Sequence, residues 1–217
     1  MTSVLIVCGG WEGHRPQETG RLLADALEAR GARAAVLDTL DVFRDAGRMR
    51  TFDAIVPVWT MGTIEPAELA GLLGAVEQGA GLAGCHAMCD AFRNETEYQF
   101  AAGGQFVAHP GGSGVTYDVR IADPDHEITR GLADFSVTSE QYYLHVDPAN
   151  HVLATTRFPV ADGPHVPNGE VQMPAAWTRR HGQGRVFYCS VGHDPDVLGE
   201  PAPLELVVRG ILWAARS

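Results

Sequence analysis

Short apolar runs alternate with amphipathic segments along the first half of the chain. The runs are typical of buried parallel strands, and they cover residues 4–8, 34–37, 52–58 and 81–85. Between them, apolar side chains recur at helical spacing in two segments, which predicts helices over residues 16–30 and 66–79. Strands and helices in this order predict a doubly wound α/β fold with a mostly parallel sheet.

The second half carries a different pattern, made of short β-like pieces. Residues 102–114 are rich in glycine and are expected to form a loop. Strands are predicted at 115–121, 135–138 and 152–156, with a hairpin of 175–178 and 185–189 after an excursion over 159–170. Apolar spacing from Leu204 to Leu212 predicts a closing helix. No repeat or linker interrupts the chain, so we expect one domain over residues 1–217 with a β-rich insertion in its second half.

Composition removes several classes of function. The chain has 27 acidic and 16 basic residues, a formal net charge of −11, and every basic residue is arginine. Without lysine, a phosphate-binding P-loop, a kinase-type lysine and a Schiff base to pyridoxal phosphate are excluded. The acidic balance argues against a nucleic-acid partner, and no apolar stretch approaches the roughly 20 residues that cross a bilayer. The N-terminus lacks signal-peptide features, so we expect a cytoplasmic protein without a membrane partner.

Three histidines follow predicted strands of the parallel sheet. His14 comes shortly after the first strand, His86 directly after the strand at 81–85, and His193 after the last predicted strand. Parallel strands bring their carboxyl ends to one edge of the sheet, where ligands bind. We therefore expect these imidazoles to share a cleft. Glu140, in a polar segment further along, is a candidate metal ligand or general base.

Residues 83–88 can form a nucleophile elbow, a sharp strand-to-helix turn with small residues on both sides of its tip. Cys85 and His86 are both candidates for the tip. The small flanking residues Ala83 and Ala87 favour Cys85 on local sterics, whereas a tip at His86 would have the bulky Met88 as a flank. A cysteine thiolate at a helix N-terminus would be nucleophilic.

Several motifs together resemble those of the ThuA-like, or trehalose-utilisation, proteins over nearly the whole chain. They are GGWEGHRP at 9–16, GCHAMCDAF at 84–92, GGQFVAHPG at 103–111, DHEITRGL at 125–132, SEQYY at 139–143, GQGRVFY at 182–188 and GHDP at 192–195. One departure is Glu127, where the family more often has proline. The resemblance implies a flavodoxin-like fold, similar to that of class I glutamine amidotransferases. It also implies histidine at the elbow tip, here His86, where amidotransferases have cysteine.

The resemblance does not extend to the amidotransferase triad. Those enzymes pair a late histidine with a glutamate two residues on, whereas Pro195 stands two residues after His193. We therefore do not expect glutamine hydrolysis. The family resemblance implies a role in sugar catabolism, so the leading hypothesis is a carbohydrate-processing hydrolase, lyase or isomerase that acts on a trehalose-type disaccharide or a keto-sugar.

The expected active site combines catalytic, metal-binding and substrate-binding side chains. His86, His193 and Glu140 are the expected catalytic residues, and His14, His86 and His193 are candidate ligands of a divalent metal, with zinc as the first choice. The metal would polarise a sugar carbonyl or activate water, and without it His86 and His193 would serve as general acid and base. No nucleotide or pyridoxal phosphate is expected. The expected substrate-binding residues are Trp11, Trp59, Asp90, Gln105 and Tyr142.

The distribution of arginine bears on the substrate. No arginine stands in the core motifs beside His86 or His193. Arg15 and Arg179 are the candidates for a fixed positive charge that would bind an anionic substrate. A neutral, polyhydroxylated small molecule is therefore favoured over a phosphorylated one. Two alternative functions remain: a PfpI-type cysteine hydrolase with Cys85 as nucleophile and His86 as its base, and a non-catalytic sugar-binding or regulatory module. A homodimer, common for this fold, is the expected assembly if the chain associates.

Overall fold

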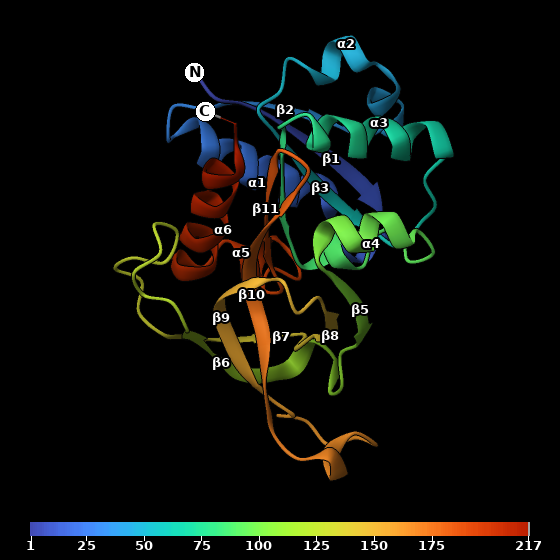
Figure 1. The fold of residues 1–217 in the computed structure, drawn as a ribbon. Coiled ribbons are helices and arrows are strands. Elements are labelled where there is room, and N and C mark those ends of the chain that lie inside the picture. The colour runs from blue at the N-terminus through green and yellow to red at the C-terminus, as the bar shows by residue number, and fades with distance from the viewer. Residues whose placement is uncertain (217) are drawn as a thin grey trace.

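The apolar runs of the first half form parallel strands at the centre of the molecule. The structure, a computed structural model, describes residues 1–216 and is drawn as a ribbon in Figure 1. In order across the sheet, the parallel strands are β2 (Arg33–Leu37), β1 (Ser3–Gly10), β3 (Ala54–Thr60), β4 (Gly81–Cys85) and β11 (Gly184–Cys189). Most side chains of β1, β3 and β4 are buried on both faces, which explains the continuous apolar runs. The predicted α/β fold is confirmed.

The second half extends the same sheet in an antiparallel manner. Beyond β11 lie β10 (Val171–His181), β9 (His151–Phe158), β6 (Val115–Ile121) and β7 (Phe135–Ser139). The predicted hairpin is the β10–β11 pair, so the β-rich segment continues the parallel sheet. The connection between β9 and β10 contains the expected excursion, which extends away from the body of the molecule (Figure 1).

The glycine-rich segment 102–114 is not a continuous loop. It contains β5 (Gly104–Ala108), which pairs with β8 (Tyr143–Val146) in a small antiparallel sheet, so the expectation of a loop was wrong there. Glycine lowers the strand propensity of such a segment, and its hydrogen-bonding partner lies far along the chain. The pair matters for the site because β5 leads towards His109 and β8 directly follows Tyr142.

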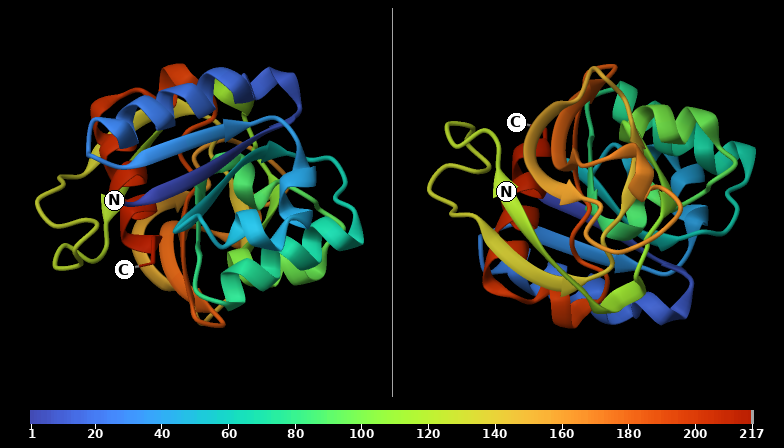
Figure 2. Two further views of the ribbon diagram at one scale, coloured as in Figure 1. Left: turned by 90° about the horizontal axis from the view of Figure 1, so that it is seen from above. Right: turned by 90° about the horizontal axis from the view of Figure 1, so that it is seen from below.

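Helices cover both faces of the sheet (Figure 2). One face carries α1 (Pro16–Glu28), α5 (Pro195–Leu198) and α6 (Pro201–Ala214), and the other carries α2 (Ala46–Met49), α3 (Pro66–Glu77) and α4 (Thr96–Ala102). Short 3-10 turns are η1 (Glu12–His14), η2 (Leu40–Arg44), η3 (His86–Cys89), η4 (Gly112–Gly114) and η5 (Val166–Asn168). As their spacing predicts, Leu23 and Leu27 of α1 are buried, and each such leucine contributes roughly 1.5–3 kcal/mol. The sheet is thus held between two apolar layers.

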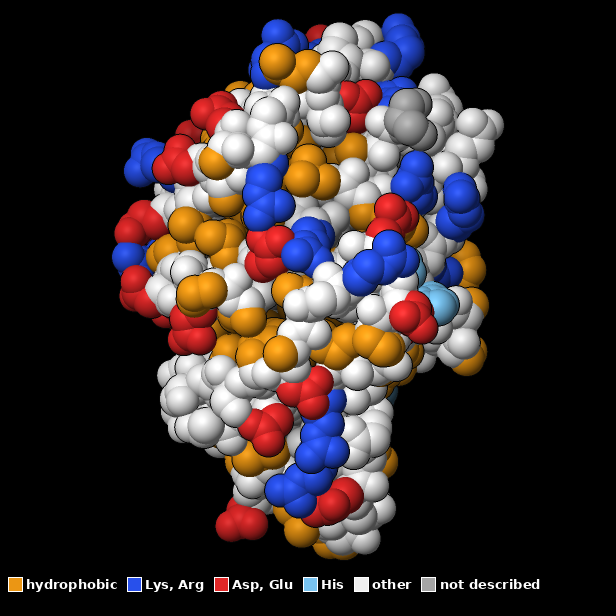
Figure 3. All heavy atoms as spheres, turned by 90° about the vertical axis from the view of Figure 1, so that its left-hand side faces the viewer, with side chains coloured by type: hydrophobic (Ala, Val, Ile, Leu, Met, Phe, Trp, Pro, Cys, Tyr) orange, Lys and Arg blue, Asp and Glu red, His pale blue; other side chains and the backbone are white. Residues whose placement is uncertain are grey.

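The surface mixes charges of both signs. On the face shown in Figure 3, arginine side chains lie beside acidic ones rather than in a single basic patch. The ion pairs of Glu205 with Arg30 and Arg209 are examples of such contacts in the structure. Pairs that are exposed to solvent contribute only about 0–1 kcal/mol each. Over residues 1–216, no helix has the length and apolar character needed to cross a membrane.

Candidate active site

His86 occupies the tip of the turn that follows β4. It begins η3 with a backbone φ of 37°, in the left-handed region, whereas Cys85 before it is still extended with φ of −131°. The Nδ1–H of His86 donates to the carbonyl oxygen of Ser190 at 2.9 Å. Because the strained residue of a strand-to-helix turn is its tip, the steric preference for Cys85 was wrong. The small residues on both sides of Cys85 did not determine which residue occupies the tip.

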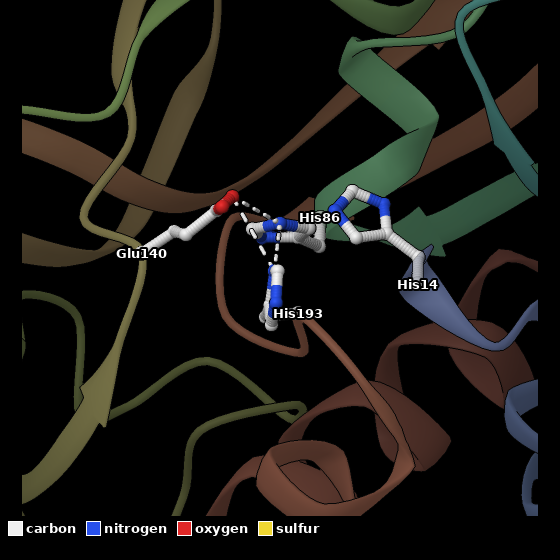
Figure 4. A group of neighbouring side chains, drawn as sticks. All are labelled: His14, His86, Glu140 and His193. Carbon is white, nitrogen blue, oxygen red and sulfur yellow. Dashed lines mark hydrogen bonds and ion pairs between the residues drawn. The ribbon is translucent and has the colours of Figure 1, made fainter. Parts of the chain in front are cut away.

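His14, His193 and Glu140 reach the same place from other segments. His14 ends η1, His193 follows β11, and Glu140 directly follows β7. The four side chains converge in Figure 4, where one ring nitrogen of His14 is directed towards His86. His14 Nδ1 also lies 2.7 Å from the hydroxyl of Thr60, at the end of β3. The histidines expected at one edge of the sheet therefore lie together, and Glu140 joins them.

Gly10 allows the loop that carries His14 to approach β3. Its φ is 83°, and a Cβ at this position would lie 2.1 Å from the carbonyl oxygen of Thr60. The N–H of Trp11 donates to that same carbonyl at 3.2 Å. A side chain at position 10 would push these strand ends apart, so glycine keeps His14 within hydrogen-bond distance of Thr60.

The cluster of His14, His86, Glu140 and His193 has a nearly regular geometry. Glu140 Oε2 lies 3.2 Å from His86 Nε2 and 3.3 Å from His193 Nδ1, and the two histidine nitrogens are 3.4 Å apart. With His14 included, one potential ligand atom from each of the four residues lies within 4.8 Å of the others. His193 is partly buried and the other members are buried. Protein thus shields most of the cluster from water.

Burial and neighbouring charge act on these groups in opposite directions. Burial and the adjacent imidazoles lower the pKa of His14 to about 3, and burial also lowers the pKa of His86. Hydrogen bonding to Glu140 raises the pKa of His193. Burial alone would raise the pKa of Glu140, but the contacts with His193 and His86 outweigh it and hold this pKa well below its usual range. Near neutral pH, the cluster contains the Glu140 carboxylate and the neutral imidazoles of His14 and His86, which offer lone pairs, whereas the raised pKa of His193 favours its protonated form.

A cleft of about 250 Å³ opens beside the cluster. It is lined by Trp11, His14, Thr60, Met61, Asp90, Arg93, Phe106, His109, Glu140 and Tyr142. Three of the expected substrate-binding residues, Trp11, Asp90 and Tyr142, are among them. A larger hollow of about 340 Å³ lies between α2 and α3, but small and apolar side chains line most of it, so we place the chemistry in the cleft beside the cluster.

Trp59 and Gln105 do not line this cleft, and a role for them in substrate binding stays a prediction. Trp59 packs against Phe92, with 6.2 Å between ring centroids. Gln105 pairs with His145 in the small sheet, and successive side chains of a strand point to opposite sides. Because its neighbour Phe106 faces the cleft, Gln105 faces away from it. The sequence positions of these two residues did not indicate the direction of their side chains.

Sequence reasoning missed Arg93 and His109. The guanidinium of Arg93 contacts Asp90 Oδ1 through Nε and Nη2, both at 2.5 Å. Arg93 lines the cleft, although only Arg15 and Arg179 were candidates from the sequence for a fixed positive charge. His109 Nδ1 lies 3.7 Å from Glu140 Oε1. His109 was visible in the motif at 103–111, whereas the only signal for Arg93 was its place three residues after Asp90.

The two arginines considered from the sequence are engaged elsewhere. Arg15 pairs with Glu18 and Asp196 on the surface. The buried guanidinium of Arg179 contacts Asp147 at 3.0 Å. Neither side chain lines the cleft, so a positive charge in the cleft comes from Arg93.

Backbone strain is concentrated around the cleft. Among the described residues other than glycine, a positive φ occurs at Arg15, Met61, His86 and Phe92. Each either belongs to the cleft or cluster, or is next in sequence to a residue that does. Such conformations cost of order 1–3 kcal/mol each, and they persist where the surroundings hold them, often at functional sites. The strain therefore supports a functional role for this edge of the sheet.

Cys85 lies on the other side of the elbow, in the apolar layer beneath α1 and α6. A Cβ on Gly192 would lie 3.1 Å from its sulfur atom, and burial raises the pKa of its thiol above the usual range. A cysteine nucleophile needs an accessible thiolate. The geometry therefore does not favour the hydrolase alternative in which Cys85 attacks the substrate and His86 is its base.

Comparison with known proteins links this geometry to a family. The profile of the ThuA family, described as trehalose utilisation, matches residues 3–214. No curated protein sequence matches the chain at a significant level. A ThuA-like protein of Bacteroides uniformis ATCC 8492 has a similar structure, with a TM-score of 0.80 and 16% sequence identity over 99% of this chain and 91% of that one.

Two further solved structures share the fold. A cytoplasmic protein of Salmonella typhimurium LT2 has a TM-score of 0.70 at 12% identity, over 100% of both chains. A glutamine amidotransferase of Thermotoga maritima has a TM-score of 0.51 at 10% identity, over 98% of this chain and 95% of that one. The expected amidotransferase-like fold is therefore confirmed. Because the family profile spans nearly the whole sequence, this chain belongs to the ThuA family.

Proposed function

We propose that this chain is an enzyme of sugar catabolism that acts on a trehalose-type disaccharide or a keto-sugar, and that its His14–His86–Glu140–His193 cluster holds a divalent metal, zinc first. The triangle of Glu140 Oε2, His86 Nε2 and His193 Nδ1, with edges of 3.2 to 3.4 Å, carries the proposal. In a tetrahedral zinc site with bonds of about 2.0–2.1 Å, neighbouring ligand atoms lie about 3.3–3.4 Å apart. The spacing of the triangle fits that geometry.

The hydrogen bonds around the cluster also favour a cation. Because the carbonyl of Ser190 can only accept, His86 Nδ1 carries a proton, and neutral His86 then directs the lone pair of Nε2 at Glu140. A lone pair and a carboxylate oxygen 3.2 Å apart repel each other unless a proton or a cation lies between them. Burial disfavours the extra proton on His86. Ser190 and Thr60 orient their histidines as partners of ligating histidines commonly do.

The chain's own groups would bind the substrate and move protons. When bound, a divalent metal supplies a Lewis acid that polarises a carbonyl or lowers the pKa of a bound water. Glu140 contributes Oε2 to the triangle, and its other oxygen, Oε1, which lies 3.7 Å from Nδ1 of the cleft residue His109, can accept a proton from a substrate hydroxyl or water. Trp11, which is half-exposed, offers a ring face to a sugar, whereas the ring of Tyr142 packs against His86 and Phe106 at the wall of the cleft. Without the metal, His193, whose pKa is raised by the hydrogen bond to Glu140, can return a proton to the leaving oxygen.

The sugar class rests on the family description, trehalose utilisation, together with a small cleft that carries aromatic and polar side chains. A cytoplasmic location is part of the proposal, in line with the description of the Salmonella protein. Self-association as a homodimer stays a prediction.

Metal analysis of the purified chain tests the metal site. Protein prepared without chelators is expected to contain a stoichiometric divalent metal, and His86→Ala is expected to lose both metal and turnover of trehalose or a keto-glucoside. The matched control is His145→Ala, which removes an exposed histidine of β8 and should change neither. Folded wild-type protein that binds no added zinc would contradict the metal site. Metal and sugar binding without turnover of either substrate would instead favour the sugar-binding module.

A further inference from the structure

Asp90 and Arg93 form a second polar group in the cleft, separate from the histidine cluster. Asp90 is 3% exposed, and Arg93 Nε and Nη2 both contact its Oδ1 at 2.5 Å. The guanidinium lies 4.9 Å from the centre of the Phe106 ring. The loop between them is attached to the end of β3, because Met61 N–H donates to the Asp90 carbonyl and Phe92 N–H donates to the Met61 carbonyl, each at 3.1 Å. The pair is therefore held in a fixed position.

The Asp90–Arg93 pair uses only part of its hydrogen-bonding capacity. Over residues 1–216, we find no hydrogen bond to Asp90 Oδ2 and none from Arg93 Nη1. Both residues line the cleft, and these are the atoms of the pair that have hydrogen-bonding capacity left for a ligand. The pair thus offers the cleft an acceptor beside a donor, and its two charges cancel.

We propose that the Asp90–Arg93 pair binds two neighbouring hydroxyl groups of a neutral sugar ring. One hydroxyl donates to Asp90 Oδ2, and the adjacent hydroxyl oxygen accepts from Arg93 Nη1. A vicinal diol can do both at once because each hydroxyl is a donor and an acceptor. A carboxylate or phosphate has no proton for Asp90 and would meet the negative charges of Asp90 and Glu140.

This inference rests on the proposed function in so far as the cleft takes a sugar, and it adds the groups that recognise the ring. The cleft volume of about 250 Å³ lies below the roughly 300–1,000 Å³ of pockets for drug-sized ligands. It therefore suits a single ring placed between the pair and the histidine cluster. The free sites of Asp90 and Arg93 would fix the position of that ring, because they engage two adjacent hydroxyl groups at once.

Calorimetric titration with methyl α-D-glucopyranoside and its 2-, 3- and 4-deoxy analogues tests the pair. In wild-type protein, removal of a hydroxyl that the pair binds is expected to weaken binding about tenfold to hundredfold, the loss typical of a hydrogen bond to a charged group. In Asp90→Asn, the affinity for the parent glucoside should fall by the same factor. The deoxy analogue should then bind this variant almost as well as the parent glucoside does. Arg93→Lys keeps the charge but not the guanidinium fork. It should also lower the affinity for the parent glucoside and reduce the difference between the glucoside and its deoxy analogue.

Arg157→Met is the matched control, because Arg157 of β9 forms an exposed ion pair with Glu170. This variant should leave all affinities unchanged. Metal content of every variant is measured in parallel. The proposal is overturned if the glucoside does not bind, if all deoxy analogues bind as well as the parent, or if the deoxy effect persists unchanged in both variants. A deoxy effect without turnover supports the pair while the enzyme proposal fails, and turnover without a deoxy effect overturns the pair alone.

Discussion

His86 Nε2 lies 3.2 Å from Glu140 Oε2, although 54 positions separate the two residues in the sequence. His86 stands at the end of β4, in the parallel part of the sheet, and Glu140 follows β7, in the antiparallel part. The contact therefore joins the two parts of the fold. Neither part by itself assembles the cluster, which explains why the β-rich second half belongs to the site.

Glu140→Gln is expected to lower the pKa of His193, because the hydrogen bond with Glu140 is what raises it. NMR titration of imidazole signals in chelator-treated protein measures the change. Chelator-treated wild-type protein, measured over the same pH range, is the reference. An unchanged His193 titration would contradict the contact between the two residues.

The metal-free chain is expected to lose stability as pH falls below about 6.5. The pKa of His14 is lowered from 6.5 to about 3 in the folded protein, so between these values the unfolded chain binds a proton that the folded chain does not, and acid favours unfolding. Below pH 4.5 the lowered pKa of Glu140 adds to the loss. The raised pKa of His193 does not alter this loss, since its stabilisation is full below pH 6.5 and is lost only as pH rises above that value.

Urea unfolding between pH 7.5 and pH 4 measures this dependence. His14→Gln should flatten the curve between pH 6.5 and pH 4.5, because the side chain that resists protonation in the folded state is gone. A wild-type midpoint that stays constant, or a His14→Gln variant with the wild-type slope, would contradict the assignment.

Gly10→Ala is expected to cost more stability than Gly31→Ala. Both glycines have a positive φ, 83° at Gly10 and 80° at Gly31, but a Cβ on Gly31 meets no atom within 4 Å, whereas one on Gly10 would lie 2.1 Å from the Thr60 carbonyl oxygen. Gly31→Ala should therefore show the backbone strain alone, about 1–2 kcal/mol, and Gly10→Ala should add a clash to it. Urea unfolding compares the two, and equal losses would argue against the close approach of β1 and β3.

The cysteine thiols of the folded chain are expected to resist alkylation at neutral pH. All four are buried, and burial raises the pKa of Cys85, Cys89 and Cys189, so the reactive thiolate is scarce. Mass spectrometry after iodoacetamide treatment should find modification only when urea is present. Rapid labelling of Cys85 in the folded protein, with loss of turnover, would restore the cysteine hydrolase as a candidate.

Local sequence patterns correctly predicted the strands and helices whose burial follows a regular pattern along the element. The strands at 4–8 and 81–85 are buried on both faces, and the helix stripe with Leu23 and Leu27 faces one layer, so composition and spacing identify them. β5 was missed because it is hydrogen-bonded to β8, which lies far along the chain. A glycine-rich sequence has low strand propensity and gives no local signal of such a pairing.

The sequence by itself determined the α/β fold, the edge of the sheet at which the histidines lie, and the absence of lysine chemistry. The family motifs already implied His86 at the tip of the elbow, but only the tertiary structure decided that its backbone is strained there, that Trp11 rather than Trp59 lines the cleft, and that Arg93 enters it. The reason is physical. A strand's existence follows from local burial, whereas a turn's backbone conformation and a side chain's direction are set by packing against segments that are remote in the sequence.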